Sequence, residues 1–131
     1  MDINKRVMIV DDEPDVLISL KTILERHNYD VITVTNGVEC LKEIQKGFTG
    51  VILMDIMMPK MDGWKTINQI VKRGYTKDIA IEIITGKGTK DYQKLSKLGS
   101  YIYDYLTKPI DLKQFVSSVE ACNNYLHSKN I

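Results

Sequence analysis

The stretch Val7-Met8-Ile9-Val10-Asp11-Asp12-Glu13-Pro14 decides the expected fold. Its first four residues form an unbroken apolar run, which is typical of a strand covered on both faces. Pro14 suits the first turn of a helix, and the residues after it repeat apolar side chains at helical spacing. The stretch therefore predicts a buried strand that ends in acidic residues and leads directly into a helix.

The same alternation of apolar run and helical pattern recurs along the chain. Strands are expected at residues 7–10, 31–34, 51–54 and 79–84, and within 101–106. A helix is expected after each strand, with the inward-facing residues Val16, Leu17, Leu20, Ile23 and Leu24; Val38, Leu41 and Ile44; Trp64, Ile67, Ile70 and Val71; a more polar segment at 89–98; and Leu112, Phe115, Val116, Val119, Cys122 and Leu126. Asn36 and Asp111 are expected to cap the second and the last helix.

Strands that alternate with helices of this length indicate βαβ units and hence a parallel sheet. Right-handed crossovers leave few ways to wind five such units. We predict an α/β fold: a single doubly wound five-stranded parallel sheet of order 2-1-3-4-5, flavodoxin-like, with helices on both faces. The chain has 131 residues, so residues 1–131 are expected to form a single domain.

Composition narrows the function classes. The formal net charge is +1, so no bulk field exists to hold nucleic acid or an anionic membrane. No apolar run approaches the ~20 residues that cross a bilayer, and nothing resembles a signal peptide. Cys40 and Cys122 fit neither a metal spacing nor a disulfide framework, and are expected to be buried thiols. These features predict a cytoplasmic protein with no direct contact to nucleic acid or membrane.

Chemically active side chains follow four of the five expected strands. Asp11 and Asp12 follow the first, Asp55 the third, Thr85 the fourth and Lys108 the fifth. Taken singly, each has an ordinary explanation as a turn or capping residue. Ligands of an open parallel sheet bind beyond the carboxyl ends of its strands, and strands one and three should be neighbours. We therefore expect these five side chains to converge.

The charges of this set constrain its chemistry. Three carboxylates and one ammonium sum to −3 + 1 = −2. Like charges ~4 Å apart repel by about 4 kcal/mol at an effective dielectric near 20, so the site must protonate, stay hydrated or bind a divalent cation. Oxygen ligands without His or Cys suit Mg²⁺, and a lysine with a hydroxyl suits a phosphoryl group. Since a carboxylate beside the metal can act as nucleophile, the residues predict Mg²⁺-dependent phosphoryl transfer onto an Asp.

Four stretches at these strand ends resemble the receiver domains of two-component response regulators. They are Val10-Asp11-Asp12-Glu13-Pro14, Met54-Asp55-Ile56-Met57-Met58-Pro59-Lys60-Met61-Asp62-Gly63, Ile84-Thr85-Gly86 and Asp104-Tyr105-Leu106-Thr107-Lys108-Pro109. The resemblance covers about residues 5–126. It implies that this core is a receiver domain of a phosphorelay.

The resemblance implies a role for each matched acidic residue. Asp55 would be the phosphoacceptor, modified by a histidine kinase or a histidine phosphotransfer protein. Asp12 and Asp55 would bind Mg²⁺ directly, together with the backbone carbonyl of Met57. Asp11 would act through a water.

The remaining matched residues would bind the phosphoryl group or report its presence. The Thr85 hydroxyl, the Lys108 ammonium and the amides of Met57 and Gly86 would hold its oxygens. Tyr105 would be an aromatic switch that turns inward as Thr85 moves. The resemblance also implies a cis Lys108–Pro109 bond.

Two features depart from the family pattern. Gly86 stands where alanine is common, but it is small enough to let a phosphate approach. The segment from Gly99 to Tyr105 is two residues longer than usual, which displaces the start of the fifth strand. Tyr101 and Tyr103 within it are further candidates for the switch, but they are expected to be packing residues on the Tyr105 side.

The resulting prediction is an aspartyl-phosphate signalling switch rather than an enzyme, apart from self-phosphorylation and self-dephosphorylation. Phosphorylation would rearrange the surface of helix 89–98, the fifth strand and the last helix, which an output protein would read. One alternative is a Mg²⁺-dependent phosphohydrolase of haloacid-dehalogenase type, which needs an acid where Met57 stands. The other alternative is an unphosphorylated receiver that only docks partners. The complete set of active residues counts against this alternative.

Overall fold

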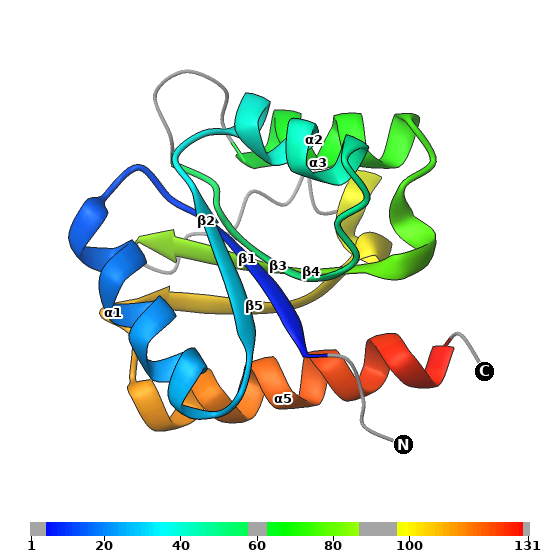
Figure 1. The fold of residues 1–131 in the computed structure, drawn as a ribbon. Coiled ribbons are helices and arrows are strands. Elements are labelled where there is room, and N and C mark those ends of the chain that lie inside the picture. The colour runs from blue at the N-terminus through cyan, green and yellow to red at the C-terminus, as the bar shows by residue number, and fades with distance from the viewer. Residues whose placement is uncertain (1–4, 58–62, 87–96, 130–131) are drawn as a thin grey trace.

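The computed structural model describes residues 5–57, 63–86 and 97–129, which form a parallel sheet with helices on both faces (Figure 1). The strand order is β2-β1-β3-β4-β5, and every neighbouring pair is parallel, which confirms the predicted topology. The elements are β1 (Arg6–Val10), α1 (Pro14–Arg26), β2 (Asp30–Val34), α2 (Gly37–Gln45), β3 (Gly50–Asp55), α3 (Gly63–Lys72), the 3₁₀ turn η1 (Thr76–Asp78), β4 (Ile79–Gly86), the 3₁₀ turn η2 (Gly99–Tyr101), β5 (Ile102–Lys108) and α5 (Leu112–Lys129).

An apolar layer covers each face of the sheet. In Figure 1, α2 and α3 lie over one face, and α1 and α5 lie over the other. Successive strand residues enter opposite layers: Met8 and Val10 join the α2–α3 layer, whereas Val7 and Ile9 join the α1–α5 layer. Because both faces are covered, an apolar side chain is needed at every position, which explains the unbroken apolar runs in the sequence.

Two helices begin where the sequence predicts, because a side chain satisfies their first free amides. Asn36 Oδ1 accepts a hydrogen bond from the Glu39 amide at 2.9 Å. The Glu39 carboxylate in turn accepts a hydrogen bond from the Thr35 amide at 3.2 Å. Asp111 Oδ1 accepts a hydrogen bond from the Lys113 amide at 3.0 Å.

The fifth strand is longer than predicted and contains a β-bulge. It ends at Lys108, two residues beyond the predicted 101–106 segment. Ile81 pairs with Ile102, but Glu82 pairs with Asp104, so Tyr103 is one extra residue opposite β4. One extra residue of the long segment noted in the sequence is therefore absorbed by the bulge, and the segment begins with the 3₁₀ turn η2.

Other side-chain predictions need correction. Val38 and Leu112 were expected to face inward, but both are exposed. Val38 lies in the first turn of α2, where Cys40 takes the buried position, and Leu112 is the first residue of α5. The helix predicted at 89–98 lies largely outside the described residues, of which 97–98 are helical.

Cys40 and Cys122 are free and buried, as the sequence predicts. Burial raises the pKa of the Cys40 thiol to about 12, so this thiol is neutral at physiological pH. Among the helices of the described ranges, none combines the length and apolar character of a membrane span.

Gly63 begins α3 at the point where this helix approaches the end of β3. A Cβ atom at Gly63 would lie 2.7 Å from the Asp55 carbonyl oxygen and 2.7 Å from Ile56 Cα. Both atoms belong to the backbone, so neither can move aside like the end of a flexible side chain. The missing side chain therefore lets α3 start directly against the strand end that carries Asp55.

We expect Gly63→Ala to lower the free energy of unfolding by roughly 1–3 kcal/mol, the usual cost of an inserted methyl group that has no space. Urea denaturation at constant pH measures this loss. Gly86→Ala is the matched control, because no described atom lies within 4 Å of a Cβ atom at that position. Its effect should stay within about 0.5 kcal/mol. Equal losses in both variants would contradict the close-approach argument.

Candidate functional site

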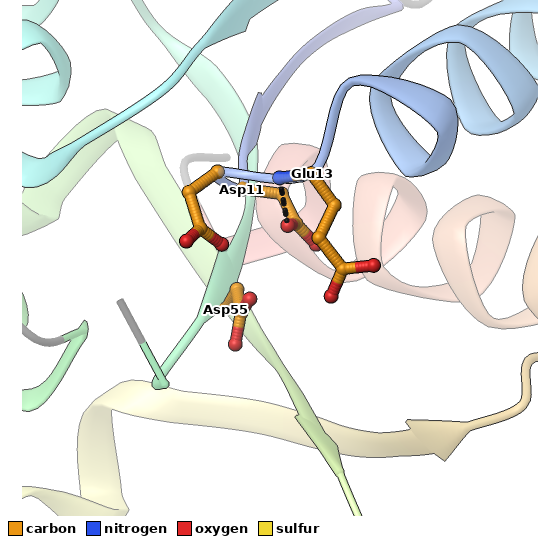
Figure 2. Close-up of side chains that lie close together, drawn as sticks. Asp11, Glu13 and Asp55 are labelled. Atoms are coloured by element: carbon orange, nitrogen blue, oxygen red, sulfur yellow. Dashed lines mark hydrogen bonds between the residues drawn. The ribbon is translucent and has the colours of Figure 1, made fainter. Parts of the chain in front are cut away.

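The candidate site lies at the carboxyl ends of the strands. Asp11 directly follows β1, Asp55 is the last residue of β3, and Lys108 is the last residue of β5. Strands β1 and β3 are hydrogen-bonded neighbours, with Val10 opposite Met54, so their next residues emerge side by side. Figure 2 shows the Asp11 and Asp55 carboxylates approaching each other, with Glu13 beside them.

Four carboxylates form the acidic part of the site. One oxygen each from Asp11, Asp12, Glu13 and Asp55 can be chosen so that all lie within 4.8 Å of one another. Asp11 and Asp55 are buried, whereas Asp12 and Glu13 are exposed. The sequence predictions named three of these acids and missed Glu13. Its signal was its place in the acidic run that follows the first strand.

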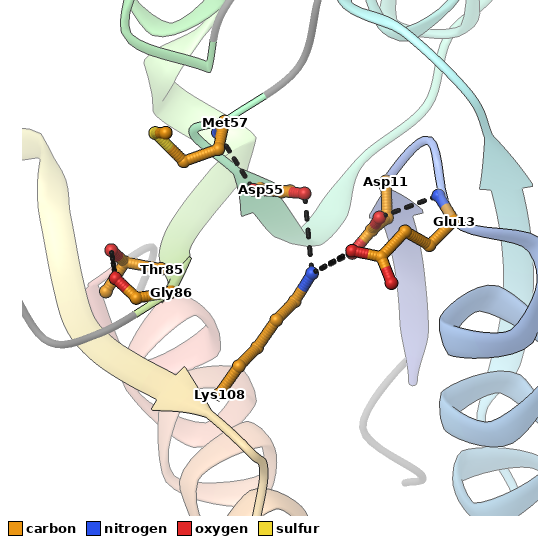
Figure 3. Close-up of polar contacts among 7 residues, drawn as sticks. All are labelled: Asp11, Glu13, Asp55, Met57, Thr85, Gly86 and Lys108. Carbon is orange, nitrogen blue, oxygen red and sulfur yellow. Dashed lines mark hydrogen bonds and ion pairs between the residues drawn. The ribbon is translucent and has the colours of Figure 1, made fainter.

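The Lys108 side chain extends from the end of β5 toward this acidic cluster (Figure 3). Its Nζ lies 3.1 Å from Asp11 Oδ2, 3.2 Å from Glu13 Oε1 and 3.5 Å from Asp55 Oδ2. One ammonium therefore faces three carboxylates, and negative charge remains in excess. The contact with Glu13 was also absent from the sequence predictions.

Backbone amides hold the two buried carboxylates in place. Asp55 Oδ1 accepts a hydrogen bond from the Met57 amide at 2.8 Å, and Asp11 Oδ1 accepts one from the Glu13 amide at 2.9 Å. The second oxygens, Asp55 Oδ2 and Asp11 Oδ2, both face Lys108 Nζ. Each carboxylate is thus oriented by the chain just after its own strand, with one oxygen directed into the site.

Thr85 and Gly86 reach the same edge of the sheet, but they point differently. Thr85 is buried, and its hydroxyl donates to the Gly86 carbonyl oxygen at 3.1 Å. Figure 3 shows this hydroxyl turned toward Gly86 rather than toward Asp55. Gly86 pairs with Lys108 across β4 and β5, so both residues end their strands at the same level.

The pKa values follow from this crowding. Burial raises the pKa of Asp11 above its ordinary value, and the charge of Asp55 raises it further, while the Glu13 amide and Lys108 lower it. For Lys108, burial lowers the pKa, but the close contact with the Asp11 carboxylate and the charges of Asp55 and Asp11 outweigh burial, and the pKa is raised. Lys108 therefore keeps its charge, whereas ionisation of Asp11 is less favourable than that of an ordinary aspartate.

Two further sequence-based expectations concern the end of β5. The Lys108–Pro109 peptide bond is cis, as predicted. Tyr105 is partly buried and packs against the α2–α3 layer, and burial raises the pKa of its phenol. Its ring therefore faces the interior. The expectation that Tyr101 and Tyr103 pack on the Tyr105 side is wrong: both are exposed, and Tyr103 stacks instead on Tyr125 of α5 with ring centroids 5.1 Å apart.

The donor set of the acidic cluster suits a divalent cation. Asp11 Oδ2 is buried and makes no hydrogen bond of good geometry with the described residues, although Lys108 Nζ lies close to it. The cluster offers carboxylate oxygens and no thiol or imidazole, which favours a hard ion such as Mg²⁺. A cation would also reduce the repulsion that raises the Asp11 pKa.

The doubly wound sheet and the acidic pocket with its lysine define the receiver class of α/β domains. The model of the response regulator receiver domain matches residues 7–120, and the chain belongs to this family of two-component signalling proteins. Receiver domains typically bind Mg²⁺ at an acidic pocket, and they interact with histidine kinases and output domains. The motif residues 58–62 lie outside the described residues.

Known proteins from several organisms resemble the chain. It is 34% identical to the alkaline phosphatase synthesis transcriptional regulatory protein PhoP of Bacillus subtilis, over 90% of this chain and 48% of PhoP. It is 33% identical to protein PilH of Pseudomonas aeruginosa, over 88% of this chain and 95% of PilH. The chain thus spans about half the length of PhoP but nearly all of PilH.

Among solved structures, the CheY-like receiver domain protein of Methanospirillum hungatei superposes with a TM-score of 0.88 and 38% sequence identity. The match covers 95% of this chain and 98% of the other. The phosphohydrolase alternative gains no support from these comparisons.

We expect Asp11→Asn to stabilise the protein in the absence of divalent cations, because the neutral amide avoids the cost of an ionised carboxyl group that is buried beside Asp55. The raised pKa means that stability is lost as the pH rises above the ordinary Asp11 value of 3.8, and the neutral Asn avoids this loss. The gain should therefore shrink as the pH falls toward 4. Thermal unfolding in EDTA across this pH range measures the gain.

In the same experiment, added Mg²⁺ should raise the melting temperature of the wild type more than that of Asp11→Asn, because binding to the folded state alone stabilises it. Asp30→Asn, which alters an exposed acid on β2, is the matched control and should behave as the wild type. An Asp11→Asn variant with an unchanged response to Mg²⁺ would remove Asp11 from the metal site.

Proposed function

We propose that this chain is a phosphoacceptor switch in which Asp55 accepts a phosphoryl group from a histidine kinase or a histidine phosphotransfer protein. The observation that carries the proposal is the position of the buried Asp55 carboxylate. One of its oxygens is held by the Met57 amide, and the other faces Lys108 Nζ at 3.5 Å beside three further acids. Residues 1–131 are proposed to form one receiver domain, with a core at about residues 5–126.

In the proposed reaction, Asp55 Oδ2 attacks the phosphorus of a phosphorylated histidine. The new O–P bond forms as the N–P bond breaks, and the imidazole nitrogen leaves with the electron pair of that bond. The transferred group brings further negative charge into an anionic pocket, so the reaction depends on neutralisation. Lys108 supplies one positive charge, and bound Mg²⁺ supplies two more.

The metal ligands are proposed to be Asp12 and Asp55, with the carbonyl of Met57, while Asp11 acts through a water. This assignment leaves Asp11 Oδ2 free to remain close to Lys108. Glu13 is exposed and contacts the same ammonium, so we assign it to positioning Lys108 rather than to the metal. The cation would reduce the mutual repulsion of the acids before phosphate arrives.

The phosphoryl oxygens are proposed to bind Lys108, the Thr85 hydroxyl, and the amides of Met57 and Gly86. Thr85 donates to the Gly86 carbonyl before phosphorylation, and the Met57 amide donates to Asp55. Both donors must therefore exchange partners when phosphate binds. We assign the resulting signal to this exchange, with Tyr105 responding to the movement of Thr85.

The altered surface would comprise segment 89–98, β5 and α5, and an output protein would read it. The acyl phosphate must bias this surface by a few kcal/mol to be useful as a switch. The chain is not proposed to be an enzyme beyond its own phosphorylation and dephosphorylation. We propose a cytoplasmic location, which its buried free thiols support.

Mg²⁺ and a small-molecule phosphodonor should increase the intact mass of the wild-type chain by one phosphoryl group. Asp55→Ala should abolish the increase, because the attacking oxygen is removed. Intact-mass spectrometry under mild conditions measures the adduct. Asp30→Ala, an exposed acid on β2, should keep it. An adduct that persists in Asp55→Ala would place the phosphoacceptor elsewhere.

Lys108→Ala should leave Mg²⁺ binding largely intact but weaken the conformational response to phosphate. The lysine contacts the acids through charge, so its loss removes the group that connects the phosphate with β5. Phosphorylation-dependent shifts of the Thr85 and Tyr105 amide resonances measure the response. Lys113→Ala on α5 is the matched control and should respond fully. A normal response in Lys108→Ala would show that the lysine has no role in the switch.

A further inference from the structure

Glu82 is a buried carboxyl group outside the phosphoacceptor site. It lies in the middle of β4, and its side chain is fully buried with a relative exposure of 0%. Its neighbours on the same face of the strand are Ala80 and Ile84, which belong to the apolar α1–α5 layer. An acid at this position needs either a positive partner or a proton, because an unpaired charge in an apolar layer is very costly.

The polar partners of Glu82 come from α5 and β5. The Ser118 hydroxyl donates to Glu82 Oε2 at 2.7 Å, and Glu82 Oε1 has no hydrogen-bond partner among the described residues. Asp104 lies directly opposite Glu82 in the β4–β5 pairing, and its Oδ2 is 3.4 Å from the same Ser118 oxygen. A hydroxyl has a single proton, so Ser118 cannot donate to both acids at once.

The other titratable groups around Glu82 do not neutralise it. Cys122 of α5, Tyr103 of β5 and Tyr29, which precedes β2, are acids whose own pKa values the charge of Glu82 raises, so none of them supplies a positive charge. From β3, the residue opposite Glu82 is the apolar Leu53. Lys129 of α5 points its Nζ to the carbonyl oxygens of Thr76 and Ile79 at 3.3 and 3.2 Å instead.

Desolvation and the nearby acid act in the same direction on Glu82. Burial raises its pKa to about 7, and the charge of Asp104 raises it as well, against lowering by the Ser118 hydroxyl and the Cys122 thiol. Glu82 would therefore change its charge near neutral pH, unlike an ordinary glutamate.

We propose that Glu82 forms a proton-dependent contact between β4, β5 and α5. While the Glu82 carboxyl is neutral, the three elements stay packed together. When the carboxyl loses its proton, the packing of α5 against the sheet loosens. The neutral acid accepts the Ser118 hydrogen bond without adding charge to the apolar layer. The ionised acid sets two carboxylates against one hydroxyl, and a movement of α5 away from the sheet would give it access to water.

The contact is connected to the signalling surface through Asp104. Asp104 Oδ1 accepts a hydrogen bond from the Tyr105 amide at 2.8 Å, so repulsion between Glu82 and Asp104 acts on the residue assigned as the switch. This consequence for signalling rests on the proposed function. The titration of Glu82 and its effect on α5 do not.

The first test is an NMR titration of the Glu82 side-chain carboxyl carbon in the intact chain. We expect a midpoint near pH 7, compared with the ordinary value of 4.5. Asp104→Asn should lower the midpoint by removing the neighbouring charge, and Ser118→Ala should raise it by removing the donor to the ionised form. A midpoint between 4 and 5 in the wild type, or shifts of the opposite sign, would overturn the proposal. The same midpoint in Asp55→Ala would separate this result from any failure of the phosphoacceptor proposal.

The second test compares unfolding of the wild type and Glu82→Gln as a function of pH. A raised pKa stabilises the fold below the ordinary value, and this stabilisation is lost as the pH rises from 4.5 to about 7. The unfolding equilibrium constant of the wild type should therefore rise by up to tenfold per pH unit over this range, relative to Glu82→Gln. Glu25→Gln on α1, an exposed site, is the matched control and should keep the wild-type profile. Identical profiles for Glu82→Gln and the wild type would overturn the proposal.

The third test is amide hydrogen exchange of α5 at pH 6 and pH 8, corrected for intrinsic exchange rates. The wild type should lose protection in α5 at the higher pH, whereas Glu82→Gln should not. Equal protection of the wild type at both pH values would show that ionisation leaves the helix in place, and would overturn the proposed loosening.

Discussion

Asp11 and Asp55 enter the same buried pocket because β1 and β3 are hydrogen-bonded neighbours, and the pocket then holds more negative charge than Lys108 offsets. Most features around the site can be understood from this excess. Backbone amides of Glu13 and Met57 fix one oxygen of each buried carboxylate. The remaining oxygens face an ammonium that belongs to another strand. A cation is favoured at this site because it reduces the repulsion between the carboxylates. A phosphoryl group is then favoured because the cation and Lys108 offset its negative charge.

Strand order explains why residues so distant in sequence can share this charge. Lys108 contacts Glu13 across 95 positions of the chain, and the parallel order β2-β1-β3-β4-β5 brings both to one edge. Helices cover both faces of the sheet (Figure 1), and the apolar layers beneath them hold the strands together. The acidic edge is therefore stabilised by apolar packing elsewhere, and its own charges can remain available for chemistry.

The sequence predicted the strands, their order and two helix caps, because these depend on local signals: unbroken apolar runs, Asn36 and Asp111. It missed features that depend on distant partners. In the sequence, Glu13 resembles an ordinary exposed acid, and only the fold brings Lys108 into contact with it. Glu82 interrupts an apolar run by one residue, and only Ser118, 36 positions later, explains how an acid can lie inside the layer. Val38 and Leu112 fit the apolar periodicity of a buried helix face, but this periodicity is a weak guide to burial at the ends of helices.

The β-bulge at Tyr103 preserves the alternation of side chains in the last strand. Since alternate residues of a strand face opposite sides, one uncompensated extra residue would exchange the two faces of everything after it. Tyr105 would then leave the α2–α3 layer, and the Lys108 side chain would project away from Asp11. With the bulge, Tyr103 and Asp104 both contact α5, through Tyr125 and Ser118, and the alternation resumes afterwards. The bulge thus separates the length of the connection before β5 from the faces to which the β5 side chains point. This connection can differ in length while Lys108, at the far end of the strand, keeps its position.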